Sequence, residues 1–175
     1  MDTSLKYVTL PQGVMLDSGQ NEVGCFSRTK LTRINLNGCT IIPAYCLNKT
    51  YVQEVIGLEN VIDIDGGQTF GMERVILPNI RAISGLFNNE DIVKYVELGE
   101  LLERIRGWSM CHKAKSIEAF VIKATTPPVL ENETMPFGYT SFPIFVPDES
   151  VNAYKSATNW ARLASRFKPI SEYVE

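Results

Sequence analysis

One apolar pattern recurs along the chain at intervals of 20 to 26 residues, and this repetition restricts the fold more than any other feature of the sequence. In each copy, a central apolar residue has a second apolar residue three positions before it and a third two positions after it, with Gly57 and Ser141 as the exceptions. The central residues are Val8, Ile34, Val55, Val75, Val96, Phe120 and Ile144. A unit this short cannot bury its own apolar face, whereas stacked units bury a continuous column. The repetition therefore predicts about seven short parallel strands in one sheet, with neighbours about 4.8 Å apart.

The segments between the predicted strands carry two further series of inward residues. Residues nine positions before the next central residue form the first series, which is Cys25, Cys46, Phe87, Cys111 and Met135, with Gly66 as the exception. Ile64, Ile83 and Ile105 form the second series, midway along their units. Each unit is therefore predicted to be a strand, a turn and an irregular or briefly helical return. A doubly wound fold would need about ten or more helical residues between strands. Glycine-rich segments such as ENVIDIDGGQTFG do not favour such helices.

The C-terminal part has the features of a cap on the stack. After Pro147, Asp148 or Ser150 is a plausible N-cap of a helix. One apolar side of that helix follows at helical spacing, in Val151, Tyr154, Ala157, Trp160 or Ala161, and Ala164. We expect Trp160 to be a core residue of the lid, because a terminal helix needs a large apolar anchor. The predicted organisation is a repeat stack over residues 1–147 and a capping helix and tail over 148–175, within one domain. The N-terminal end shows no comparable cap.

Residues that flank each central residue should point away from the column, because side chains alternate along a strand. Arg33, Glu54 and Arg74 alternate in sign on successive units and suit a stabilising ladder of ion pairs. Outward Ile56, Ile76, Val121 and Phe145 would form an apolar patch, which favours a partner surface. The alternatives for that patch are cover by a local loop or an ordinary preference for sheet-forming residues. The candidate partner-binding residues are Tyr7, Arg33, Glu54, Ile56, Arg74, Ile76, Tyr95, Val121 and Phe145.

Charge and hydropathy exclude some partners. The formal net charge of −3 gives no broad electrostatic attraction to nucleic acid. No window approaches the roughly 18 consecutive apolar residues of a membrane span. We therefore expect neither a nucleic-acid partner nor membrane insertion.

The sequence offers little for metal binding or catalysis. The four cysteines match no zinc-site spacing and His112 is the single histidine, so we expect no metal and no cofactor. Cys111 lies beside His112, but its place in the inward series favours a buried structural thiol. Asp63 and Asp65 precede two glycines, which favours a tight turn over a calcium or phosphate loop. Cys25 and Cys46 occupy equivalent positions on consecutive units and are expected to be free thiols. We therefore expect no enzyme activity.

Several segments resemble the BspA-like leucine-rich repeats of bacterial surface proteins of the Bacteroides type. The repeat segments are LKYVTLPQGV, MERVILPNIRAISGLF and VKYVELGELLERI. The ending FVIKATTPPVL, followed by IFVPDESVNAYKSATNW, resembles the closing segment of those proteins. The resemblance implies an α/β-type right-handed leucine-rich-repeat solenoid with irregular returns and a C-terminal capping helix. It also implies an adhesin or binding scaffold at the cell surface or outside the cell, with no shared catalytic motif.

Two functions remain open from the sequence. The first is a non-catalytic interaction or adhesion module that presents its sheet face to a protein or glycan partner. The second is a structural component of a virion or cell-envelope assembly, which would self-associate through the uncapped N-terminal end and the outward apolar residues. The start MDTSLKYV lacks the pattern of a secretory signal, so an intracellular or virion location is the alternative to the cell surface.

Overall fold

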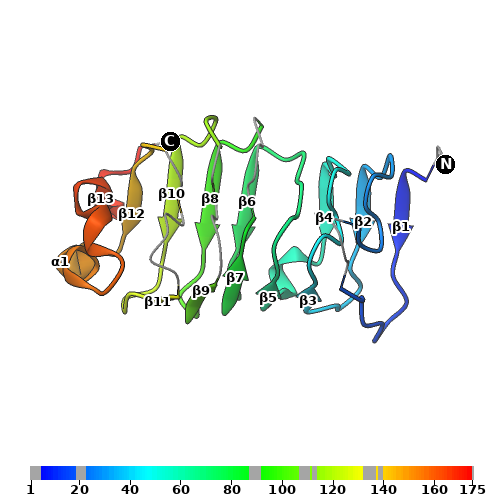
Figure 1. Cartoon of the computed structure of the whole chain (residues 1–175), viewed down its shortest axis with the longest axis horizontal. Helices are drawn as coiled ribbons and strands as arrows, with labels where there is room; N and C mark the ends of the chain where they lie inside the picture. The colour runs from blue at the N-terminus through cyan, green and yellow to red at the C-terminus, as the bar shows by residue number, and fades with distance from the viewer. Residues whose placement is uncertain are drawn as a thin grey trace.

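The chain forms short parallel strands joined by loops and a few short helices (Figure 1). This computed structural model describes residues 5–18, 23–86, 92–106, 111, 114–131, 137 and 140–174. Successive coils of the chain lie side by side along the long axis of the molecule, as the strand order and Figure 1 show. The predicted α/β class with parallel strands is confirmed.

The predicted central residues lie at matching positions of neighbouring strands. In one sheet, Val8, Ile34 and Val55 are aligned on β1 (Tyr7–Thr9), β2 (Arg33–Asn35) and β4 (Glu54–Ile56). In a second sheet, Val75, Val96, Phe120 and Ile144 are aligned on β6 (Arg74–Leu77), β8 (Tyr95–Leu98), β10 (Ala119–Ile122) and β12 (Ile144–Val146). The repeating apolar pattern therefore predicted the register of the strands within each of these two sheets correctly.

The prediction of a single sheet is wrong, because the described strands form three sheets. The predicted line of strands divides between β4 and β6, where an isolated bridge from Val52 to Phe70 stands in place of a ladder. A register continued from that bridge would align Val55 with Glu73, two residues before Val75. These two extra residues move β6 out of register with β4, so the ladder cannot continue across the gap.

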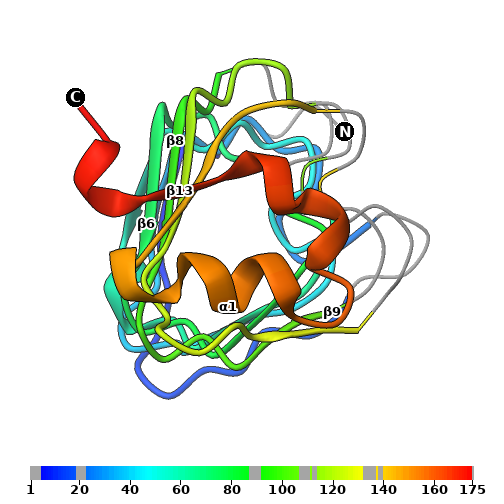
Figure 2. The same ribbon diagram turned by 90° about the vertical axis from the view of Figure 1, so that its left-hand side faces the viewer.

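The third sheet lies in the return segments, which were expected to be irregular. Its strands are β3 (Ile41–Ile42), β5 (Asp63–Ile64), β7 (Ala82–Ser84), β9 (Arg104–Arg106) and β11 (Val129–Leu130). Ile64, Ile83 and Ile105 are aligned and buried there, as the midway series predicted. Viewed along the stack, the coils overlay one another around the core and α1 (Val151–Ser156) lies across the end (Figure 2).

The remaining inward series is only partly confirmed. Cys46 and Cys111 are buried, and burial raises the pKa of both thiols. Cys25 is exposed, contrary to the prediction, and its thiol donates to the carbonyl of Asp17. Phe87 and Met135 lie outside the described residues. Cys25 and Cys46 are free thiols, as expected, and so are Cys39 and Cys111.

The C-terminal end is closed by aromatic side chains, but not by one long helix. Short 3-10 turns flank α1, namely η2 (Asp148–Ser150) and η3 (Ala161–Arg166). Tyr154 and Trp160 are buried as predicted, and they donate hydrogen bonds to the carbonyls of Ala124 and Pro128. The chain then forms β13 (Phe167–Pro169), an unpredicted strand that pairs with β12 and places Phe167 beside Ile144. The predicted tail is thus partly one more strand of the stack.

Neither expected capping side chain performs that role. No side chain makes a capping hydrogen bond at the start of α1, where Ser150 stands. The carboxylate of Asp148 instead accepts from the backbone N–H of Ser171, at 3.1 Å, in η4 (Ile170–Glu172). The Ser171 side chain and this backbone N–H together lower the pKa of Asp148, and the contact links the start of the cap to the segment after β13.

At the opposite end, β1 is the outermost strand of its sheet in the described part of the chain. Leu5 and Tyr7 are exposed beside this edge.

The segment after β4 contains the short 3-10 helix η1 (Leu58–Asn60), which begins after Gly57, a residue with φ of 88°. Among the described residues, no helix has the length and apolar character needed to cross a membrane.

Candidate functional site

The outward face consists of the side chains that flank the central residues on the first two sheets. Five of the nine predicted partner-binding residues are exposed on this face: Tyr7, Arg33, Glu54, Arg74 and Ile76. Ile56 is half-buried. The expected exposure of the other three is wrong, because Tyr95, Val121 and Phe145 are only 7%, 3% and 6% exposed.

The chain's own C-terminal segment covers those three residues. Ile170 and Tyr173 pack on the cluster of Tyr95, Val121 and Phe145. The Tyr173 ring centroid lies 5.5 Å from that of Tyr95 and 5.2 Å from that of Phe145, distances typical of interacting aromatic pairs. We call residues 170–174 the tail cover. Local cover therefore accounts for this half of the apolar patch.

The predicted ladder of charges forms in part. The Arg33 and Glu54 side chains are joined by an ion pair of 2.9 Å across neighbouring strands. The Arg33 guanidinium also lies over the Tyr7 ring, 5.2 Å from its centroid. Arg74 belongs to the next sheet, and its guanidinium lies 4.0 Å from the centroid of the Tyr95 ring. The sheet boundary thus separates Arg74 from the first two residues of the predicted ladder.

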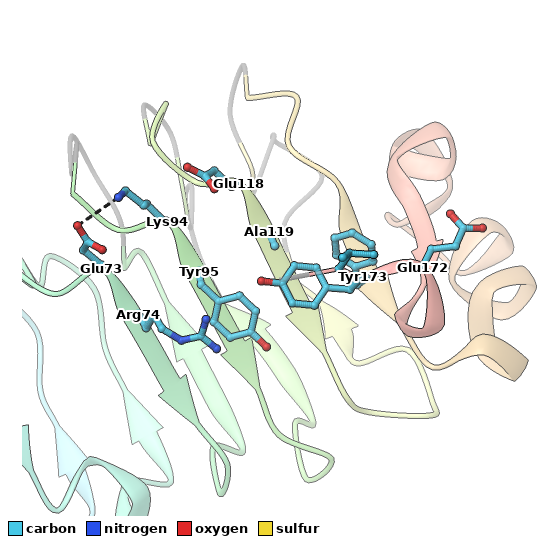
Figure 3. Close-up of a pocket in the computed structure, with 10 residues that line it drawn as sticks. Glu73, Arg74, Lys94, Tyr95, Glu118, Ala119, Glu172 and Tyr173 are labelled. Carbon is cyan, nitrogen blue, oxygen red and sulfur yellow. Dashed lines mark hydrogen bonds and ion pairs between the residues drawn. The ribbon is translucent and has the colours of Figure 1, made fainter.

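A groove opens on the outward face beside the tail cover. It has a volume of about 480 Å³. Strands β6, β8 and β10 supply one side and residues 172–174 the other (Figure 3). The side chains that line it are Glu73, Arg74, Lys94, Tyr95, Glu118, Ala119, Phe145, Glu172, Tyr173 and Val174. In Figure 3, Ala119 lies on the strand behind the groove and the Tyr173 ring points towards Tyr95. We call this cavity the tail groove.

Charged groups at the tail groove are arranged around this aromatic pair. Lys94 and Glu73 form an ion pair of 3.2 Å at one end, drawn as a dashed line in Figure 3. Glu118 stands near that end and Glu172 on the side of the tail cover (Figure 3). The groove therefore offers aromatic surface together with both signs of charge.

The Tyr95 hydroxyl is held by a carboxylate two residues further along β8. It donates to a carboxylate oxygen of Glu97 at 2.6 Å, while Lys123 contacts the other oxygen at 2.5 Å. Burial acts to raise the pKa of Glu97, but these two partners and the charge of Arg74 together lower it. Burial and the Glu97 carboxylate raise the pKa of Tyr95. At neutral pH, Tyr95 is therefore a neutral hydrogen-bond donor held in one orientation.

A second, smaller cavity lies next to this polar cluster. Its volume is about 370 Å³, and Glu97 and Lys123 line it together with Pro78, Asn79 and the segment 99–101. The outward face is thus hollowed on both sides of the Tyr95 and Glu97 pair.

The aspartates of the DIDGG segment are engaged by protein groups. Asp65 accepts hydrogen bonds from the Ser84 hydroxyl at 2.6 Å and from the Gly66 N–H at 2.9 Å. Asp63 forms an ion pair with Arg106. Gly67 has φ of 80° within this segment, as a tight turn requires. In the described part of the chain, no group of three or more His, Cys, Asp or Glu side chains is placed to hold a metal ion. His112 lies outside the described residues.

Sequence reasoning missed the residues that complete the tail groove. Glu172 and Tyr173 belong to a tail that was expected only to follow the capping helix. The spacing of Ile170 and Tyr173 could have indicated this role. Two apolar residues three apart in a polar segment can lie on the same side of a turn and cover an apolar surface. Ala119 was not among the predicted partner-binding residues, because its side chain is small. The same small side chain leaves room for the groove.

Replacing Tyr173 with alanine should expose the aromatic residues beneath the tail cover. We expect the free energy of unfolding to fall by about 1–3 kcal/mol, because the substitution removes one partly buried ring and its two aromatic contacts. Urea titration would measure the loss, and binding of a hydrophobic dye would report the exposed surface. Val174→Ala is the matched control, since Val174 is 85% exposed and should change neither reading. Equal behaviour of the two variants would contradict the assigned role of Tyr173.

No protein-family model matches the sequence, and no curated protein matches it significantly. The outward face, with the tail groove and the exposed residues of β1 to β6, is therefore the basis on which a function can be inferred.

Proposed function

We propose that the chain is a right-handed leucine-rich-repeat solenoid that acts as a non-catalytic interaction module. Its outward face would bind a protein or glycan partner. The aligned central residues and the second line of buried isoleucines support the repeat assignment, because both recur once per coil. The observation that carries the functional proposal is the tail groove, with aromatic and charged side chains gathered beside exposed Arg74 and Ile76.

The composition of this surface suits recognition. Tyrosine and arginine contribute much of the binding energy at protein interfaces, since each combines a large contact area with hydrogen-bonding groups. Tyr95, Tyr173 and Arg74 meet at one end of the exposed part of the outward face. Of the nine residues predicted from sequence, we retain Tyr7, Arg33, Glu54, Ile56, Arg74 and Ile76 as proposed partner contacts. The tail groove replaces Tyr95, Val121 and Phe145 as separate exposed contacts.

A role in binding rather than catalysis is supported by what the groove residues already do. The Tyr95 hydroxyl donates to Glu97, and Lys94 is paired with Glu73. Cys111 is fully buried, so its thiol is not part of the outward surface.

A pair of isoleucine substitutions tests which face binds. Ile76 on β6 is 41% exposed on the outward face, whereas Ile41 on β3 is 51% exposed on the third sheet. We expect Ile76→Asp to weaken partner binding at least tenfold, because it places a charge in an apolar contact, and Ile41→Asp to leave binding unchanged. Binding would be measured on an array of defined glycans and on purified extracellular glycoproteins before and after removal of their glycans.

The glycoprotein measurements separate the two partner classes. Binding that is retained after the glycans are removed identifies a protein partner, and binding that is lost identifies a glycan partner. A partner that binds wild type and both variants equally would exclude the outward face as the contact surface.

Assembly with further copies of the chain is the second proposal. Leu5 and Tyr7 are exposed beside the edge strand β1, and such edges favour pairing with another chain. Sedimentation of the purified chain distinguishes the two proposals. A monomer at all concentrations favours the interaction module, whereas an oligomer that Leu5→Asp dissociates favours an assembly component that associates through the β1 edge.

A further inference from the structure

Two cysteines on adjacent coils lie side by side in the same register as the neighbouring strands. Asn35 on β2 is aligned with Ile56 on β4, and the N–H of the next residue, Leu36, donates to the Ile56 carbonyl at 2.9 Å. The Phe26 N–H donates to the carbonyl of Cys46 at the same distance of 2.9 Å. By the same pattern, Cys25 is aligned with Cys46.

The contact continues on both sides of this pair. The Arg28 N–H donates to the Asn48 carbonyl at 2.9 Å, and the Ser27 hydroxyl donates to the Tyr45 carbonyl at 2.9 Å. A Cβ atom added at Gly24 would lie 2.5 Å from the Tyr45 oxygen, so the two turns are in direct backbone contact. Hydrogen-bonded neighbours of this kind are about 4.8 Å apart, within the range of roughly 4.4–6.8 Å that disulfides span between α-carbons. The two sulfurs lie close enough for Cys25 to contribute to the raised pKa of Cys46.

The two thiols differ in their access to solvent. Cys25 is exposed, and its thiol donates to the Asp17 carbonyl at 3.4 Å. Cys46 is fully buried, as is Cys111, and Cys39 is nearly so. Burial, together with the contact with Cys25, raises the pKa of Cys46. Cys25 is therefore the thiol that an oxidant in solution reaches, and Cys46 is the thiol placed to react with it next.

We propose that Cys25 and Cys46 form a redox-sensitive site, at which a small-molecule disulfide oxidises the pair to a disulfide bond between two coils. The Cys25 thiolate attacks the small disulfide, forms a mixed disulfide and releases one small thiol. The Cys46 sulfur, after losing its proton to water, then attacks the Cys25 sulfur and releases the second small thiol. The two cysteines lose two electrons and two protons in total, and the oxidant gains both to become two thiols.

This bond would act on the N-terminal part of the stack. It would join the 26-residue first unit, the longest in the chain, to the unit that follows. The bond would close a loop over residues 25–46, which restricts the unfolded chain and stabilises the folded one. The site does not depend on the proposed binding function, because neither cysteine lies on the outward face.

The reaction can be followed on the whole chain with glutathione. The reduced protein is incubated with glutathione disulfide, quenched by alkylation and analysed by mass spectrometry of intact protein and peptides. We expect the oxidised chain to take up two alkyl groups where the reduced chain takes up four, its mass before alkylation to be lower by about 2 Da, and a peptide pair to be joined through Cys25 and Cys46. The rate should rise with pH, because the second step needs the Cys46 thiolate. The thermal midpoint should rise by roughly 5–10 °C on oxidation.

Single substitutions test the assignment without relying on one variant. Cys25→Ser changes an exposed residue, so it should fold normally and lose both the bond and the thermal shift. Cys46→Ala should stop at one glutathione attached to Cys25, and Cys39→Ala should still form the bond. The proposal is overturned if wild type retains the mixed disulfide without converting it, if another cysteine pair is joined, or if Cys25→Ser keeps the thermal shift.

Discussion

Replacing Gly99 with alanine is expected to lower the free energy of unfolding by about 2–4 kcal/mol. Gly99 follows β8 at the position aligned with Pro78, which follows β6. A Cβ atom at Gly99 would lie 1.8 Å from the backbone oxygen of Pro78. No rotation of a side chain relieves that contact, because the obstructing atom belongs to the main chain. The two coils would have to separate, which weakens the hydrogen bond of 3.0 Å from the Gly99 N–H to the Leu77 carbonyl.

Gly66 provides the matched control for this substitution. A Cβ atom there would lie 3.5 Å from the Ser84 hydroxyl, an ordinary contact distance. Gly66→Ala should therefore change the free energy of unfolding by less than about 1 kcal/mol. Urea denaturation of both variants and of wild type measures the difference. If Gly99→Ala proved as stable as Gly66→Ala, the coils at Pro78 and Gly99 could not be packed as closely as described.

The apolar period predicted the strands well because it records a physical requirement that every coil shares. A residue such as Val96 or Ile144 must fill the column between its neighbours, so its position along the unit fixes the register of the strand around it. The same requirement placed Ile64, Ile83 and Ile105 in a buried line, although no local pattern indicated that their short segments would pair as a third sheet. Pairing of two or three residues depends on the backbone of the neighbouring coil, which no local pattern describes.

The candidate site was harder to predict because it depends on contacts between distant segments. Phe145 has the sequence features of an outward apolar residue, and it is outward on its strand. Its exposure is decided by Tyr173, which reaches it through a strand and a turn that follow the cap. Nothing local to β12 could indicate that cover. The break between β4 and β6 has a similar origin, since the Val52 to Phe70 bridge sets a register that Val75 does not continue.

The cap was predicted through its aromatic anchor, and Trp160 makes the strongest case for a large effect. Its ring lies 5.5 Å from that of Tyr154, 5.9 Å from that of Phe167 and 6.0 Å from that of Phe137, measured between centroids. Its indole N–H donates to the carbonyl of Pro128 at 2.8 Å. The residue therefore joins α1, β13 and the last return segment at the closed end of the stack.

Trp160→Ala is expected to lower the free energy of unfolding by about 3–5 kcal/mol, because it removes a fully buried ring and leaves the Pro128 carbonyl without its donor. Trp160→Phe keeps most of the ring but not the hydrogen bond, so it should cost about 1–2 kcal/mol. Lys155→Ala, on the exposed side of α1, should be nearly neutral. Denaturant titration measures the loss of stability of each variant. The loss should be largest for Trp160→Ala, smaller for Trp160→Phe and smallest for Lys155→Ala, because burial and one hydrogen bond set this order. A loss for Trp160→Phe as large as for Trp160→Ala would assign the stability of the cap to the hydrogen bond rather than to the packing of the ring.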